Sequence, residues 1–218
     1  MHELPVFPLD LVVFPGQTVP LLVFEARYKR LVKAVLELDE PRFVIVRTRP
    51  AADGPAMATV GTVVRVVELA ERPDGTYTLT GHGGERVQVD VARREDVPEA
   101  DGSERPLFFT RAEPLPVVRD DPNLERIAAW DALEAFRRYA RVFFAADAEQ
   151  QIDDHVPDEP LYQASFVCAN LRLEGDERQA LLEAPSLVDR FRLAERLLEE
   201  RVRAHAPGLG GATPGETP

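Results

Sequence analysis

Three stretches near the start of the chain decide its fold: Leu4-Pro5-Val6-Phe7-Pro8-Leu9, Val13-Phe14-Pro15-Gly16 and Pro20-Leu21-Leu22-Val23-Phe24-Glu25-Ala26-Arg27-Tyr28. Proline cannot donate to a sheet ladder, so the strands here are expected to be short, bulged or at an edge. The pattern then changes to the helical period, with five apolar residues on one stripe: Tyr28, Leu31, Val32, Val35 and Leu36. This predicts an amphipathic helix over residues 25–38 that packs on the strands.

The next part of the chain, up to residue 115, is predicted to be mostly β. The predicted strands are Phe43 to Val46, Thr59 to Leu69, Thr76 to Thr80, Arg86 to Val91 and Leu107 to Ala112. Pro73-Asp74-Gly75 predicts a hairpin turn. The glycine run 81–84, Gly81-His82-Gly83-Gly84, is expected to break a strand as a turn or bulge. A polar loop is expected at residues 95–105. About six strands and one helix are typical of a small barrel or a twisted sheet.

Beyond the stiff linker Glu113-Pro114-Leu115-Pro116, the sequence predicts only helices. Asp121 and Pro122 match an N-cap and first helical residue, and an apolar face is expected from Trp130, Leu133, Phe136, Ala140, Phe143 and Phe144, ending near Ala148. Residues 147–159 read as an acidic connector. Three further helices are expected: one over 160–173 stopped by Gly175, a short one capped by Asp176, and a last one capped by Ser186.

Composition limits the possible functions. The 218 residues carry 26 basic and 38 acidic side chains, a net charge of −12, so non-specific binding to nucleic acid or to an anionic membrane is disfavoured. The single cysteine, Cys168, cannot form an intramolecular disulfide and reads as a core residue. Because no apolar run is long enough to span a membrane and no signal peptide opens the chain, we expect a cytoplasmic protein. The Gly-, Pro- and Thr-rich tail at 207–218 is expected to be disordered.

Patterns that carry chemistry are missing from the sequence. Its two lysines, Lys29 and Lys33, follow no glycine, which argues against a phosphate-binding loop. None of the three serines lies in a nucleophile elbow, and the four histidines are scattered without zinc-ligand spacing. The acidic run at 147–159 lacks the central glycine of a calcium loop. We therefore expect no catalytic residue, no metal site and no cofactor.

The opening stretches resemble the N-terminal substrate-binding domain of the Lon protease family. In that family a Leu-Pro-Leu-Phe-Pro-Leu strand, a Phe-Pro-Gly turn and a Pro-Leu-x-x-Phe-Glu-x-Arg-Tyr junction follow at the same spacings. Further matches are Val60-Gly61-Thr62, Gly84-Glu85-Arg86-Val87, Leu181-Leu182-Glu183 and the segment 186–198, so that the resemblance covers roughly residues 3–200. Two departures are Leu107, where the family often has an aromatic residue, and a longer loop at 95–105.

The resemblance implies an α+β fold, with a PUA-like β subdomain over residues 1–116 and a helical bundle over 117–206. It also implies a non-catalytic module that binds unfolded or apolar polypeptide segments and serves a protease as adaptor or regulator. Lon proteases continue into ATPase and Ser-Lys protease domains, which this chain is expected to lack, so degradation itself is not carried over. The expected binding residues are Phe14, Pro15, Leu22, Phe24 and Tyr28, displayed on the proline-stiffened segment. The alternative for the aromatic residues Phe7, Phe14, Phe24 and Tyr28 is that they belong to the core, with Pro15-Gly16 as a simple turn.

Two other functions stay open at this point. PUA-like folds often bind RNA, and Arg93, Arg94, Arg105 and Arg111 could form a local basic cluster. An enzyme would need titratable side chains that converge in a cleft, which a sequence alone does not reveal. We expect a groove between the two subdomains, because ligand sites often lie at such junctions.

Overall fold

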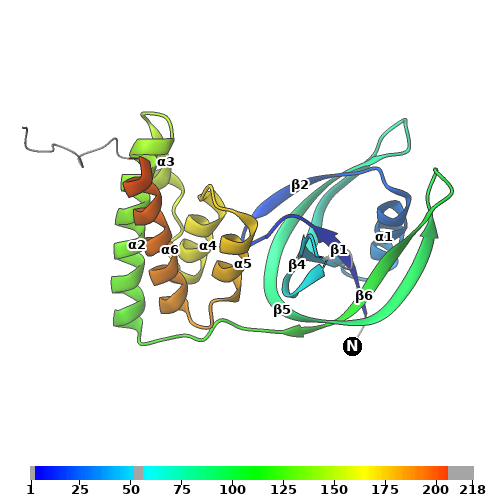
Figure 1. The fold of residues 1–218 in the computed structure, drawn as a ribbon, viewed down its shortest axis with the longest axis horizontal. Helices are drawn as coiled ribbons and strands as arrows, with labels where there is room; N and C mark the ends of the chain where they lie inside the picture. Colours follow the sequence, from blue (N-terminus) through cyan, green and yellow to red (C-terminus); the bar gives the residue numbers. More distant parts are fainter. Residues whose placement is uncertain (1–2, 52–55, 206–218) are drawn as a thin grey trace, which may run out of the picture.

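The computed structural model describes residues 3–51 and 56–205. The six strands and one helix, α1, form the first part of the described chain, and five further helices follow, which confirms the α+β prediction (Figure 1). The strands are β1 Leu4–Leu9, β2 Thr18–Val23, β3 Arg42–Arg49, β4 Ala56–Glu71, β5 Tyr77–Pro98 and β6 Glu104–Pro114. The helices are α1 Ala26–Leu36, α2 Pro122–Phe143, α3 Ala148–His155, α4 Pro160–Asn170, α5 Gly175–Glu183 and α6 Leu187–His205.

The six strands form one sheet that closes on itself. Its order is β2-β5-β4-β3-β1-β6, and β5 pairs with β6 as well. The closure depends on β5, which at 22 residues is long enough to pair with β2 and β4 along its first half and with β6 along its second. β1 runs parallel to β3, and the other pairs are antiparallel. The prediction of a small barrel or twisted sheet is confirmed.

Apolar side chains on alternating positions of the strands form two cores. On one face, Phe7, Phe43 and Ile45 pack with the buried stripe of α1, and Tyr28 lies 4.1 Å from the ring of Phe7, centroid to centroid. On the other face, the buried residues of a second cluster come from strands, such as Val6, Val44 and Val87. The strands are therefore buried on both faces, and the helix predicted over 25–38 covers the first.

Two details of the predicted β pattern are wrong. The glycine run 81–84 does not end a strand, because β5 passes through it; the register of β5 against β4 shifts on both sides of the run, which agrees with the bulge prediction. Glycine is needed at position 83, where a Cβ would collide with the carbonyl oxygen of Phe14. The loop expected at 95–105 is also shorter, because β5 continues to Pro98 and β6 begins at Glu104.

Helix ends follow the predicted caps only in part. Asp121 accepts hydrogen bonds from the first-turn amides of α2, with Pro122 beside it, and Ser186 accepts one from the amide of Asp189 in α6. α5 begins at Gly175 with a capping box between Glu174 and Glu177, so Asp176 is not its cap. α2 ends at Phe143, and α4 ends at Asn170, each a few residues before the predicted end.

The helical half contains two larger departures. Residues 148–155, predicted as connector, form α3, in which Ala148 and Ile152 are buried one turn apart. Two apolar residues among charged ones are too few to show as a helical pattern. Trp130 is 64 % exposed and does not share the buried face of α2. At 100° per residue it lies about 120° around the helix from Phe136, beyond the edge of the buried stripe.

Side chains cross from the barrel to the helices at several points. Phe14 is fully buried in the main helical core beside Phe136 and Leu181. Arg86 on β5 donates hydrogen bonds to four carbonyl oxygens, of Leu115, Pro116, Leu182 and Ala184. Gln179 Nε2 on α5 donates to Val60 O at 3.0 Å. The division at residue 116 stays a prediction, and the two halves share a packed junction.

Candidate functional site

The five residues expected to bind a ligand lie in different environments. Leu22 and Phe24 are 52 % and 61 % exposed. Pro15 is buried but lies at the junction of the two halves. Phe14 belongs to the helical core, and Tyr28 to the barrel core, where its hydroxyl donates to Pro8 O at 3.1 Å. The expected display of Phe14 and Tyr28 is therefore wrong, because both aromatic rings are used to pack helices against strands.

Leu22 lies in β2 and Phe24 directly after it, and among the described residues β2 is an edge strand whose partner is β5. Leu22 lines a shallow depression of about 510 Å³ on this part of the sheet. Its other walls come from β4 and β5, for instance Leu69 and Thr78. Of the predicted binding residues, Leu22 thus lines this depression, and Phe24 is exposed directly after β2.

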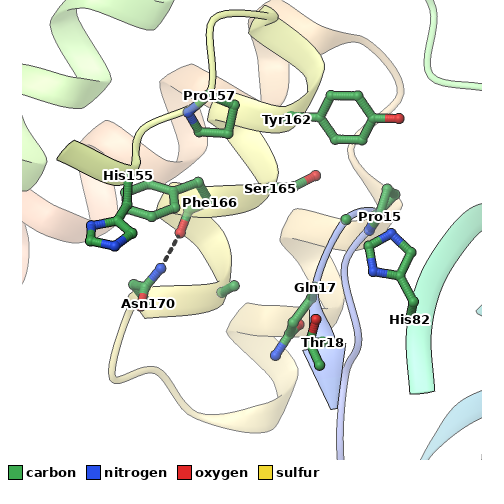
Figure 2. A pocket seen from close by; sticks show the side chains of 12 residues that line it. Pro15, Gln17, Thr18, His82, His155, Pro157, Tyr162, Ser165, Phe166 and Asn170 are labelled. Atoms are coloured by element: carbon green, nitrogen blue, oxygen red, sulfur yellow. Dashed lines mark hydrogen bonds between the residues drawn. The ribbon is translucent and has the colours of Figure 1, made fainter. Parts of the chain in front are cut away.

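A larger groove of about 640 Å³ lies between the barrel and the helices, and we call it the junction groove (Figure 2). One wall consists of the loop and strand start Pro15, Gly16, Gln17 and Thr18, together with His82 of β5. The other wall consists of His155, Pro157 and the α4 residues Tyr162, Ser165, Phe166, Ala169 and Asn170. Figure 2 shows His82 and His155 on opposite sides of it. The expected groove between the halves is present.

The loop wall is held in place by backbone hydrogen bonds to β5. Gly16 N donates to Gly83 O, and Gly83 N donates to Gln17 O, both at 2.8 Å. Gly16 has φ +83°, a conformation that side chains with a Cβ rarely adopt. The Phe-Pro-Gly turn and the glycine run are far apart in sequence, but these hydrogen bonds join them into one unit. Their backbones approach so closely that a Cβ at position 83 would collide with the carbonyl oxygen of Phe14.

The helical wall is α4, whose start is fixed by a cap. Glu159 accepts hydrogen bonds from the amides of Leu161 and Tyr162, and Pro160 occupies the first turn. Tyr162 is 47 % exposed and lies against the loop wall, since a Cβ added at Gly16 would be 3.0 Å from its Cδ1. Phe166 is partly buried and packs edge-on against Phe136 at 6.0 Å. The groove thus presents one exposed aromatic ring, of Tyr162, and one partly buried ring, of Phe166.

The polar groups of the junction groove leave both donors and acceptors available. Gln17 Oε1 accepts from Phe14 N at 3.0 Å, which turns its amide nitrogen away from the loop. Asn170 Nδ2 donates to Phe166 O at 2.8 Å, and the Ser165 hydroxyl donates to Leu161 O at 3.1 Å, so that their oxygens remain as acceptors. No lining residue within the described ranges is acidic, lysine or arginine. Such a surface matches the paired donor and acceptor of a peptide group.

Other residues considered as functional from the sequence are buried in the core or paired with neighbouring side chains. Cys168 is a core residue as predicted, and burial raises the pKa of its thiol to about 12. The arginines considered for a basic cluster are paired with carboxylates: Arg93 with Glu3 and Glu95, Arg94 with Asp96, and Arg105 with Glu25. Among residues 3–51 and 56–205, no three His, Cys, Asp or Glu side chains are grouped so that they could hold a metal ion. No helix in the described part is both long and apolar enough to cross a membrane.

Comparison with known proteins agrees with this fold. The family model described as the ATP-dependent protease La (LON) substrate-binding domain matches residues 3–200. The chain belongs to this family. Curated relatives in the Lon family include Lon protease of Escherichia coli K12, 24 % identical over 204 residues, and Lon protease of Azospirillum brasilense, 28 % identical over 204 residues. The alignments cover 92 % and 91 % of this chain but 25 % and 24 % of those proteins.

Solved structures of Lon N-terminal domains share the fold. The N-terminal domain of the Mycobacterium avium complex Lon protease has a TM-score of 0.69 and 16 % identity, covering 91 % of this chain and 99 % of that one. The Lon N-terminal domain protein of Xanthomonas campestris has a TM-score of 0.56 and 23 % identity, covering 91 % and 98 %. This chain therefore spans about a quarter of the curated Lon proteases but nearly the whole of these solved domains.

Most residues of the junction groove were not predicted from the sequence. Tyr162, Phe166 and Asn170 read as ordinary positions of a helix, and His82 and His155 as scattered histidines. They meet only because α4 packs beside the Pro15–Thr18 loop. The one available signal was Pro15-Gly16, the family turn that the groove shares with the predicted residues.

Proposed function

We propose that this member of the Lon substrate-binding domain family is a non-catalytic module that binds unfolded or apolar polypeptide segments in the junction groove. One observation carries the proposal: exposed Tyr162 and partly buried Phe166 line the same cavity as three polar side chains, of Gln17, Ser165 and Asn170, that each keep a donor or acceptor beyond their internal hydrogen bond. Its volume of about 640 Å³ falls within the roughly 300–1,000 Å³ of typical ligand sites. Aromatic rings would bind apolar side chains while Gln17, Ser165 and Asn170 bond to the backbone.

The shape of the site favours an extended chain. The loop wall is anchored by buried Phe14 and by backbone hydrogen bonds to β5, and α4 begins at the cap formed by Glu159, so both walls are fixed by contacts within the chain. A preformed site lowers the ordering cost of binding. Peptide groups recur along an extended chain, so one segment can meet the donors and acceptors on both walls.

Binding of a fluorescein-labelled 16-residue peptide with an apolar centre tests the proposal by fluorescence anisotropy. Tyr162→Ala is expected to weaken binding about tenfold, the usual loss for an aromatic anchor in an interface. Trp130→Ala is the matched control, because Trp130 is another exposed aromatic residue on a helix and does not line the groove. Circular dichroism and urea unfolding establish that both variants fold. Equal affinity of Tyr162→Ala and the parent chain would reject the groove as the site.

The predicted surface at Leu22 and Phe24 is the alternative site for the same activity. A Leu22→Ser, Phe24→Ser double variant is expected to keep its affinity for the peptide if the junction groove binds it. Loss of binding in this variant alone would move the site to the β2 edge and retain the module's function.

We further propose that the bound segment is delivered to a protease, as adaptor or regulator. The relatives are named Lon proteases, which supports a role next to proteolysis. Adding the chain to a degradation assay of fluorescent casein by Escherichia coli Lon protease is expected to change the rate, and Tyr162→Ala is expected to reduce that effect. An unchanged rate of casein degradation at a saturating concentration of this protein would reject the adaptor role with this protease.

A further inference from the structure

Basic side chains form a row on the barrel that leads into the junction groove. Arg42 of β3 lies opposite Arg65 of β4, Arg65 lies opposite His82 of β5, and His82 lies opposite Thr18 of β2. Residues directly opposite in an antiparallel pair project to the same face of the sheet. Arg42, Arg65 and His82 therefore share one face, and we call them the basic row. His82 and Thr18 at its end also line the junction groove.

The cavities of the protein support this geometry independently. A depression of about 300 Å³ is lined by all three residues of the basic row. It shares Pro15, Gly16, His82 and Tyr162 with the junction groove. The two hollows are thus neighbours around Tyr162, and a chain lying in the groove can continue along the basic row.

The charges of the basic row are only partly compensated. Arg42 pairs with exposed Glu40 at 3.5 Å, and Glu85 also lines the depression. Arg65 is exposed and forms no ion pair with any residue of the described ranges. The formal charges lining the depression are balanced, because Glu40 and Glu85 stand against Arg42 and Arg65. The guanidinium of Arg65 is the cation among them that lacks an ion pair within the described ranges, and it lies next to a groove without charged lining residues.

We infer that the basic row selects, among polypeptide segments bound in the junction groove, those that carry aspartate or glutamate a few residues from an apolar side chain. The inference rests on the proposed function and adds the class of segment. The apolar residue would occupy the groove beside Tyr162 and Phe166. The carboxylate would then meet the Arg65 guanidinium, a charge-assisted hydrogen bond for which arginine geometry is suited.

Three fluorescein-labelled peptides of 16 residues test the inference, with the same apolar centre flanked by Glu, Gln or Lys. At about 50 mM NaCl the Glu peptide is expected to bind the full chain about fivefold more tightly than the Gln peptide, as expected for one or two surface ion pairs. At about 300 mM NaCl the difference should shrink, because salt screens exposed charges. The Lys peptide should bind most weakly.

Arg65→Gln is expected to abolish the preference for the Glu peptide and leave the affinity for the Gln peptide unchanged. Arg72→Gln is the matched control and should retain the preference, since Arg72 is exposed at the β4–β5 turn and lines neither hollow. Both positions are solvent-facing, so folding should be retained, and urea unfolding checks it.

The outcomes separate this inference from the proposed function. Equal affinities of the Glu and Gln peptides would overturn the inference, while the loss caused by Tyr162→Ala would still support the groove. Failure of all three peptides to bind would overturn both. A labelled 20-nucleotide oligouridylate that binds more tightly than the Glu peptide, and loses affinity in Arg65→Gln, would assign the basic row to nucleic acid and overturn the inference.

Discussion

Replacement of Arg86 by methionine is expected to destabilise the junction between barrel and helices by about 2 kcal/mol. Arg86 is buried and donates to four carbonyl oxygens at 2.7 to 3.1 Å. Leu182 O keeps a donor in the variant, because Arg190 Nη2 also bonds to it at 3.2 Å. The other three, of Leu115, Pro116 and Ala184, lose a partner, at about 1 kcal/mol each.

Part of this loss is offset because the variant no longer buries a charge. Burial, followed by the nearby charge of Arg190, lowers the pKa of Arg86 to about 10, which reports the desolvation of its guanidinium. Methionine is apolar and of similar length, so it fills the space without leaving an unpaired cation. The net change is therefore expected to be about 2 kcal/mol, less than three lost hydrogen bonds would give.

Urea unfolding followed by circular dichroism measures this change. With a slope of about 2 to 3 kcal/mol per molar urea for a chain of this size, the midpoint should fall by about 1 M. Arg72→Met is the control and should leave the midpoint unchanged, because Arg72 is exposed at the β4–β5 turn. A midpoint for Arg86→Met within error of the parent chain would refute the reasoning, as would an equal loss in the control.

Three further predictions use single residues. Cys168, with its thiol pKa raised to about 12 by burial, should react with a thiol reagent at pH 8 only on unfolding in urea, and rapid stoichiometric labelling of the native chain would contradict this. Gly16→Ala should weaken peptide binding, because the added Cβ would press on Tyr162. Gly102→Ala is the control: Gly102 also has a positive φ but lies in open space, so this variant should lose only about 1 kcal/mol of stability, from backbone strain, and keep its affinity for the peptide. Burial raises the pKa of Tyr28 to about 12, so the unfolded state ionises first and stability should fall as pH rises from 10 to 12; an unchanged urea midpoint over this window would argue against it.

The barrel half could be predicted from sequence because its signals are local. The prolines at 5, 8 and 20, the stripe on the helix 26–36 and the turn at Pro73-Asp74-Gly75 each act within a few residues. The family resemblance then supplied the order of these pieces. The length of β5 was not predicted, because the glycines in the run 81–84 indicate a break, whereas in the structure Gly81 and Gly83 allow close contacts with Val64 and Phe14.

The candidate site could be predicted only in part, because it depends on long-range packing. Exposed Phe24 and buried Phe14 have the same chemistry, and no local pattern separates them. Phe14 is covered by α2 and α5, which follow more than a hundred residues later. Likewise, α3 forms on two buried residues, Ala148 and Ile152, whose partners lie on other helices.

Photo-crosslinking tests most directly the claim that the junction groove binds polypeptide. A peptide with benzoylphenylalanine at the centre of its apolar segment would be irradiated with the full chain, and the crosslinked residues mapped by mass spectrometry. We expect crosslinks on the Pro15–Thr18 loop and on α4 between Tyr162 and Asn170, both competed by unlabelled peptide. Competed crosslinks confined to Leu22, Phe24 or the outer face of α2 would contradict the account.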